Sequence, residues 1–303
     1  MHTRVAPALL VIATVSGHRL PMQQLRTSST VQRAPTPFLT AASATAAGTA
    51  KKAELLDAIA DYNAATDADG VPSVDFGVKG GELDSDTRAP RDLLAANAFF
   101  GVSQRVGEAA DRVIAAVDAL TPENPTSEPL EGFGTPEGAD VCPLHGRWCN
   151  MFTTAADATF SKDSKRGDAS VSNQVDAVTG RTLNVIEFNA REHPAFRATR
   201  QTAPPPPLDS LKVVLSATKA SANRVELIFR RVRARLNLKL LGLRFGLTLV
   251  LPVPGPFITR ILFFFKRKKQ PPPAFFDVLY LDDTLRVHRT GQGNTFVQRR
   301  AEA

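Results

Sequence analysis

The sequence has few of the residues that build disulfide frameworks and metal centres. Its 303 residues include only two cysteines, Cys142 and Cys149, which excludes a disulfide-stabilised scaffold. The two thiols and His145 have the chemistry of zinc ligands, but no fourth ligand is indicated and the spacing matches no standard zinc motif. We therefore expect ordinary thiols here, with neither a metal nor a cofactor.

Catalytic motifs are also missing. The chain contains no Gly-x-Ser-x-Gly, no His-Glu-x-x-His and no P-loop. The run 291–293 has two glycines but no helical pattern after it, so it suits a hairpin turn better than a phosphate loop. Asp282 and Asp283 are adjacent, and neighbouring side chains at a strand end point apart, which suits a turn rather than acid–base chemistry. We expect no enzymatic activity and no catalytic residues.

Acidic residues are absent from the first 53 positions, although the whole chain has 30 of them. An apolar run from Val5 to Val15 follows His2 and Arg4, which is the layout of a secretory signal and too short to span a bilayer. The stretch from there to Ala50 is rich in Ser, Thr and Ala with three Arg, as in a transit peptide. Residues 1–50 are therefore interpreted as a removable targeting sequence, either a signal followed by a transit peptide or one long transit peptide. The first alternative predicts a plastid surrounded by extra membranes and reached through the secretory pathway.

Charge divides the remaining chain into an acidic and a basic part. Residues 51–145 carry 7 basic and 18 acidic side chains, whereas residues 146–303 carry 26 basic and 12 acidic ones. A basic region can serve anionic lipid head groups, nucleic acid or an acidic protein. The arginine-rich stretch 224–235 lacks the interleaved aromatic residues on which bases stack, so we do not expect a nucleic-acid partner.

Helical periodicity is confined to the region before residue 121. Leu55, Leu56, Ile59 and Tyr62 predict a short helix over 52–62, and residues 63–90 are expected to form a loop. A second helix is predicted within 91–120 by the stripe Val106, Ala110, Val113, Val117 and Leu120. The stretch 123–140, rich in Pro and Gly, separates these helices from the C-terminal half of the chain. We thus expect a helical region with flexible linkers at 51–140 and a second domain at 141–303.

After Gly146 the apolar period changes to two. In the clearest case, alternate residues from Leu243 to Leu251 place one apolar face along a strand. Further strands are predicted at 147–154, 182–188, 211–219, 224–232, 275–281, 285–289 and 295–299. Eight or so short strands with no helix between them predict an antiparallel barrel or sandwich.

Two motifs at the ends of this β region resemble those of a known family. Gly146-Arg147-Trp148 resembles the lipocalin signature, and the longer stretch from Leu144 to Ala155 resembles a segment of the plastid lipid-associated (fibrillin) family. The stretch from Tyr280 to Arg289, with the residues up to Val297, resembles the closing hairpin of that family. The chain departs from the pattern in two places, because Phe152 stands where the family often has Tyr and Thr290 lengthens the turn.

The resemblance implies a fold, a location and a role. The fold is a mainly β, lipocalin-like antiparallel β-barrel preceded by a small helical N-terminal region. The location is the plastid, peripheral to plastoglobules or thylakoids. The role is to bind or coat hydrophobic molecules such as lipids, carotenoids and prenylquinones. A non-catalytic accessory factor for plastid prenyl-lipid metabolism is the alternative.

Three groups of residues are candidates for this role. The expected barrel floor consists of Gly146, Trp148 and Arg286, with Arg286 either over the face of Trp148 or exposed on its hairpin. The expected lining of the barrel is Trp148, Phe152, Phe188, Phe229, Leu247 and Tyr280. The expected contact with a membrane surface is Phe257, Phe263, Phe264, Phe265, Lys266, Arg267, Lys268 and Lys269.

The third group has a second interpretation. Its apolar run, 257–265, is too short to span a membrane and has no clear period, so it can equally be a buried strand or helix followed by a solvated charge run.

Overall fold

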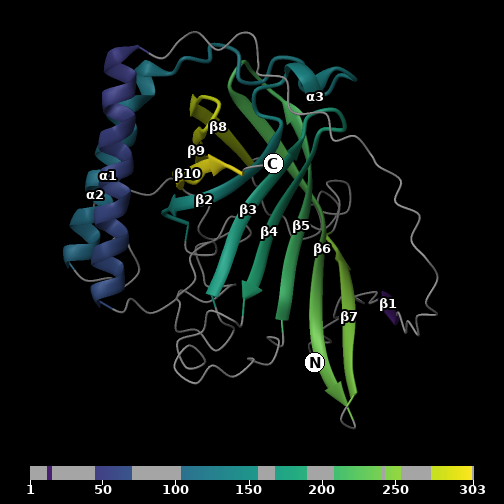
Figure 1. Cartoon of the computed structure of the whole chain (residues 1–303). Helices are drawn as coiled ribbons and strands as arrows, with labels where there is room; N and C mark the ends of the chain where they lie inside the picture. The colour runs from purple at the N-terminus through teal and green to yellow at the C-terminus, as the bar shows by residue number, and fades with distance from the viewer. Residues whose placement is uncertain are drawn as a thin grey trace, which may run out of the picture.

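The computed structural model describes residues 12–15, 45–69, 104–155, 168–189, 208–240, 243–253 and 274–301. These residues form an antiparallel β-barrel with a pair of helices against one side (Figure 1). The mainly β, barrel-like fold expected from the sequence is confirmed.

Eight antiparallel strands close the barrel. Neighbours along the sheet follow the order β6-β5-β4-β3-β2-β10-β9-β8, and β8 pairs in turn with β6, for example Phe276 with Val225. Closure removes the open edges that a sheet of this size would otherwise expose. The strands are β2 (Gly146–Thr153), β3 (Asp168–Asp176), β4 (Arg181–Asn189), β5 (Leu208–Lys219), β6 (Arg224–Leu240), β8 (Ala274–Leu281), β9 (Leu285–Thr290) and β10 (Thr295–Arg300).

One hairpin extends beyond the closed barrel. β6 is 17 residues long, and only residues 224–227 pair with β8, whereas residues 231–240 pair with β7 (Leu243–Pro252). The short strand β1 (Ile12–Val15) pairs with the other edge of β7. In Figure 1 the β6–β7 hairpin projects below the barrel, away from the end at which α3 (Gly138–Val141) lies.

Two helices cover the outer face of β2, β8, β9 and β10. α2 (Gln104–Leu120) buries its whole predicted stripe, which ends at Leu120, and the one-turn helix η2 (Thr121–Glu123) follows it. α1 (Ala46–Asp69) packs beside α2, with Leu55 and Ile59 buried. The cluster between helices and barrel contains Leu55, Ile59, Ala110, Val113, Val117, Leu120, Phe152, Tyr280, Leu285, Val287 and Val297.

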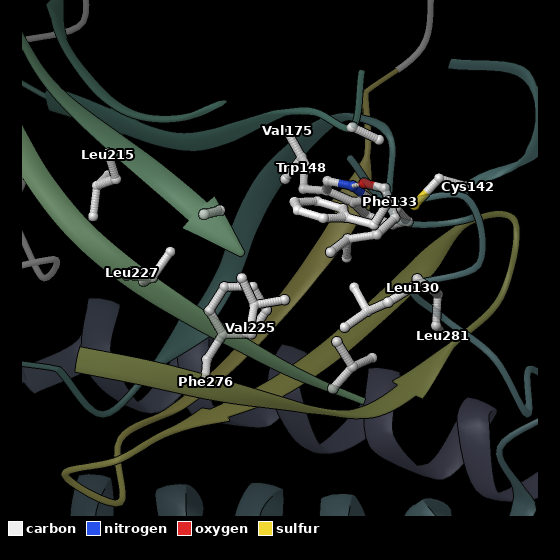
Figure 2. Close-up of a cluster of buried hydrophobic side chains, with 14 of the residues drawn as sticks. Leu130, Phe133, Cys142, Trp148, Val175, Leu215, Val225, Leu227, Phe276 and Leu281 are labelled. Carbon is white, nitrogen blue, oxygen red and sulfur yellow. Dashed lines mark hydrogen bonds between the residues drawn. The ribbon is translucent and has the colours of Figure 1, made fainter. Parts of the chain in front are cut away.

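The linker between α2 and β2 closes one end of the barrel. Four of its side chains, Leu130, Phe133, Cys142 and Leu144, are buried against residues of the inner face. Figure 2 shows Phe133 and Cys142 beside Trp148, with Val225 and Phe276 next to each other. We call this end the plugged end. A separate apolar cluster of the inner face, Ile186, Phe188 and Leu211, lies farther along the long strands.

The structure corrects three details of the sequence-based prediction. α1 continues to Asp69, so the expected loop begins later than residue 63. Leu56, assigned to the buried face of that helix, is 36% exposed. β3 was not predicted, because Ser170, Ser172, Asn173 and Gln174 leave it with only two valines. Its two neighbours in the barrel supply the pairing that makes this polar segment a strand.

Candidate functional site

The inner face of the barrel is mainly apolar on one half of the wall and polar on the other. On β3, β4, β5 and β6 it is mainly apolar, as at Ile186, Leu211 and Val213. On β9, β10 and β2 it carries polar side chains in a continuous row, because Gln298 lies opposite Arg286 on one side and Asn150 on the other. His288 and Thr290 follow Arg286 at alternate positions of β9 and share its face. We call these five residues the inner polar wall.

Trp148 stands at the plugged end of this face. Its ring is fully buried, and its Nε1 donates a hydrogen bond of 3.0 Å to the carbonyl oxygen of Leu144. Gly146 precedes it with a φ of 121°, and a Cβ there would lie 3.0 Å from Nη1 of Arg300. A side chain at this position would therefore be strained and would crowd the guanidinium group.

Two arginines lie over the Trp148 ring. The Cζ of Arg300 is 4.2 Å from the ring centroid and the Cζ of Arg286 is 5.5 Å from it, both within cation–π range. Arg300 is anchored to the backbone, since its Nη1, Nη2 and Nε donate to the carbonyl oxygens of His145, Pro143 and Asp283.

Arg286 is the most deeply buried charged side chain of the site, with 1% of its surface exposed. Its Nη2 donates to Oδ1 of Asn173 at 2.9 Å, while Nε and Nη1 have no hydrogen-bond partner. Burial, and then the nearby charge of Arg300, lower the pKa of Arg286 to about 9. Arg286 therefore still carries its charge at neutral pH.

His288 is held between two aromatic rings. Its ring stacks on Phe296 at a centroid distance of 4.8 Å and lies 4.8 Å from Phe276 in a tilted arrangement. Burial, and then the charge of Arg286, hold the pKa of His288 well below its usual value. The imidazole is therefore neutral at pH 7, and its Nδ1 has no partner.

The family model PAP_fibrillin matches residues 97–299. The chain belongs to this family. The matched region runs from the segment before α2 through all eight barrel strands to β10. No curated protein and no solved structure matches the chain.

The residues expected at the floor of this PAP_fibrillin barrel lie close together. Gly146 and Trp148 are in β2 beside the plugged end, and Arg286 reaches over the Trp148 ring from β9. Arg300 was not among the residues expected at the floor, although its Cζ is closer to that ring.

The six residues expected to line the barrel fall into different places. Trp148, Phe188 and Phe229 belong to the inner clusters, and Leu247 is in β7, outside the closed barrel. Phe152 and Tyr280 instead pack under the helices, on the outer face.

Two β-bulges explain this correction. Pairing shifts register between Asn150 and Phe152 and between Val278 and Tyr280. An extra residue at each place reverses the alternation, so the side chains that a strict period of two would direct inward point outward.

Three of the residues considered for metal binding or acid–base chemistry, Cys142, His145 and Asp282, have structural roles. The Sγ of Cys142 lies 3.8 Å from the carbonyl oxygen of Pro129, and His145 Nδ1 accepts the backbone N–H of Ala177. Asp282 accepts hydrogen bonds from Lys52 Nζ at 2.6 Å and Tyr280 Oη at 2.8 Å. Within the described ranges no group of three or more metal-ligating residues occurs.

The expected membrane-contact residues, Phe257, Phe263, Phe264, Phe265, Lys266, Arg267, Lys268 and Lys269, lie outside the described residues. None of the helices in the part of the chain that the structure describes has the length and hydropathy of a membrane span.

Proposed function

We propose that this protein binds hydrophobic molecules, such as lipids, carotenoids or prenylquinones, and acts at the surface of plastoglobules or thylakoids without catalysing a reaction. The observation that carries the proposal is a closed barrel, in a PAP_fibrillin chain, whose inner face is mainly apolar along β3–β6. Lipocalin-type barrels of eight strands hold one small ligand inside.

The apolar inner face favours binding inside the barrel. Ile186, Phe188 and Leu211 form a cluster with Val171, Leu208, Val232 and Ala234 around it. The linker before β2 closes the plugged end of the barrel. The apolar cluster on the long strands lies in the part of the interior that is farther from this end. A ligand with a long hydrocarbon tail suits this distribution.

The β6–β7 hairpin favours contact with a lipid surface. Leu238 and Phe245 are paired across the hairpin and are 44% and 42% exposed. They continue an apolar row that includes Leu236 with Leu247 and Ala234 with Leu249. Arg233 and Arg235 alternate with this row and face the other way, so one face of the hairpin is apolar and the other basic. Such a face can enter the acyl boundary of a lipid monolayer or bilayer.

Nucleic-acid binding has less support. Arg224 forms a two-bonded ion pair with Asp277, Arg230 donates to Ser216, and Arg235 lies 3.5 Å from Asp209. These arginines therefore already have partners on the protein. The alternative, a non-catalytic accessory role in prenyl-lipid metabolism, would involve the same hydrophobic ligands.

Native extraction tests the proposal. The full chain is purified without detergent, and co-purifying molecules are identified by mass spectrometry, while flotation with lipid vesicles is measured in parallel. A stoichiometric hydrophobic molecule would support binding inside the barrel, and flotation of ligand-free protein would support a surface role. Protein that neither retains a hydrophobic molecule nor floats would contradict the proposal.

The hairpin can be tested separately. The double substitution Leu238→Glu with Phe245→Glu places two carboxylates on the apolar face and should reduce flotation at least tenfold. The matched control, Thr248→Glu, adds a carboxylate opposite Arg235 on the basic face and should leave flotation unchanged. Equal flotation of both variants would argue against docking through this hairpin.

We also propose, from sequence alone, that the segment 257–269 contacts the lipid surface. Replacing Lys266, Arg267, Lys268 and Lys269 with Gln should weaken flotation with anionic vesicles, because each cation contributes about 1 kcal/mol near an anionic surface. Undiminished flotation at moderate salt would contradict a role for this segment.

A further inference from the structure

Hydrogen-bonding atoms without a partner are concentrated on one wall of the barrel. Among the described residues, the buried side-chain atoms that lack a partner include Arg286 Nε and Nη1, His288 Nδ1 and Thr290 Oγ1 on β9. Gln298 Oε1 on β10 and Asn150 Oδ1 on β2 complete the set on this wall. Buried polar groups normally have partners, so such a group of neighbours on one inner face indicates a site for a polar ligand.

Arg286 determines the charge of that ligand. Its Nε and Nη1 together carry three N–H donors, and no carboxylate within the described ranges forms an ion pair with it. The charge that acts on its pKa is that of Arg300, which has the same sign. A buried charge without a counter-charge is costly to the fold, and an anion of the ligand would remove that cost.

The contacts that Arg286 already makes do not satisfy it. Its Cζ lies over the Trp148 ring at 5.5 Å from the centroid and over the Phe276 ring at 5.7 Å, and neither ring offers an acceptor oxygen for its N–H groups. The unpaired N–H groups lie in the plane of the guanidinium group, where an oxyanion binds. A purely structural cation–π role would leave these donors unused.

The neighbours of Arg286 can complete an oxyanion site. Gln298 is 3% exposed and lies opposite Arg286 across the β9–β10 ladder, and Asn150 lies opposite Gln298. The unpaired atoms of these two amides are the acceptor oxygens Oδ1 and Oε1, so each amide must rotate to present its NH2 group, whereas the Thr290 hydroxyl can donate without such a change. The wall thus offers neutral donors beside the positive charge of Arg286, which is opposite in sign to the charge of a carboxylate.

We infer that the inner polar wall binds the carboxylate head group of a single-chain amphiphile, whose hydrocarbon tail lies along the apolar inner face of β3–β6. This inference rests on the proposed binding of hydrophobic molecules inside the barrel and names the class of ligand. The polar end lies beside Trp148 at the plugged end, and the tail extends toward Ile186, Phe188 and Leu211.

The comparison of oleate with methyl oleate tests the inference. The two probes have the same tail and differ in the charge of the head group. The full chain is titrated with each, by calorimetry and by the fluorescence of Trp148, which is the only tryptophan of the chain and lies against Arg286. Oleate should bind at least tenfold more tightly than methyl oleate and should change the Trp148 emission.

Three variants assign that preference to the guanidinium group. Arg286→Met should lower oleate affinity to that of methyl oleate and leave methyl oleate binding within twofold of wild type. Arg286→Lys keeps the charge but not the guanidinium geometry and should retain part of the preference. The control is Arg289→Gln on the outer face of the same strand, which removes an ion pair with Asp118 and a hydrogen bond to Oγ1 of Thr295 and should leave both affinities unchanged.

The outcomes separate this inference from the proposed function. Equal affinity of wild type for both probes would overturn the carboxylate site while leaving hydrophobic binding intact. Loss of preference in Arg289→Gln to the same extent as in Arg286→Met would also overturn it. Failure to bind either probe would count against both. If Arg286→Met does not fold, the wild-type comparison and Arg286→Lys still decide.

Discussion

The two halves of the barrel wall distribute polar side chains in opposite ways. On β4, β5 and β6 the inner face is mainly apolar and the outer face carries charges such as Glu187, Lys212 and Arg233. On β9 the outer residues Leu285 and Val287 are apolar, and the inner residues are polar. The helices cause this difference, because α1 and α2 cover the second half and turn its outer face into a core.

This reversal of polarity between the two halves shows which face of each half stabilises the fold and which face is available for binding a ligand. With an apolar layer under the helices, the wall of β8, β9, β10 and β2 does not depend on its inner face for burial. That inner face can therefore hold polar groups that are imperfectly paired, as is common at binding sites. The opposite half has no such second core among the described residues, and its inner face is mainly apolar.

The largest effect is expected from placing a charge in the apolar half. Leu215 is fully buried on the inner face of β5, so Leu215→Arg would bury a cation with no partner and destabilise the fold by about 5 kcal/mol. The protein should be largely insoluble or unfolded, as measured by soluble yield and circular dichroism. Thr218→Arg, exposed on the same strand and opposite Glu226, is the control. A folded Leu215→Arg variant would show that the two halves tolerate buried charge alike.

The layer under the helices is the second target. Phe152 is 2% exposed and packs edge-to-face on Tyr62 of α1 at a centroid distance of 5.0 Å. Phe152→Ala should lower the free energy of unfolding by about 3–5 kcal/mol in denaturant titrations. Ligand affinity per folded molecule should not change, because the side chain is outside the barrel. A changed preference between oleate and methyl oleate would contradict that placement.

Sequence alone predicts the barrel but not which face of each strand is inside. The order of elements, the stripe of α2 and the residues Gly146, Trp148 and Arg286 follow from periodicity and from the family resemblance. His288, Thr290 and Gln298 were missed, because a polar residue alternating with an apolar one normally faces solvent. On β9 this rule fails because the apolar stripe of the helices packs against the outer face of the strand. Where a helix packs depends on residues far apart in the sequence, so the local pattern of β9 does not reveal it. The β-bulges likewise turned Phe152 and Tyr280 to the outer face, although a strict period of two would direct them inward.

The attachment of α1 to the barrel gives a smaller, pH-dependent effect. Burial alone would raise the pKa of Asp282, but hydrogen bonds from Lys52, Thr284 and Tyr280 outweigh it and lower that pKa. Such a group stabilises the fold above its unfolded pKa, and the contribution is lost as the pH falls through the folded value. Asp282→Asn should therefore cost about 2 kcal/mol at pH 7 and progressively less below about pH 4. A cost that stays constant down to pH 2 would contradict this assignment.

The smallest expected effect is a gain in stability when Arg286 of the inner polar wall is replaced. Arg286→Met removes an unpaired buried charge and keeps a flexible apolar side chain over Trp148, so unfolding should become harder by about 1 kcal/mol in the absence of ligand. Because burial lowers the pKa of Arg286 to about 9, the charge penalises the fold fully below that pH. The gain should shrink as the pH rises from about 9 toward the unfolded value. Denaturant unfolding of both proteins at pH 7 and pH 10 measures this difference, and a loss of stability at pH 7 would mean that Arg286 is retained for packing rather than for a ligand.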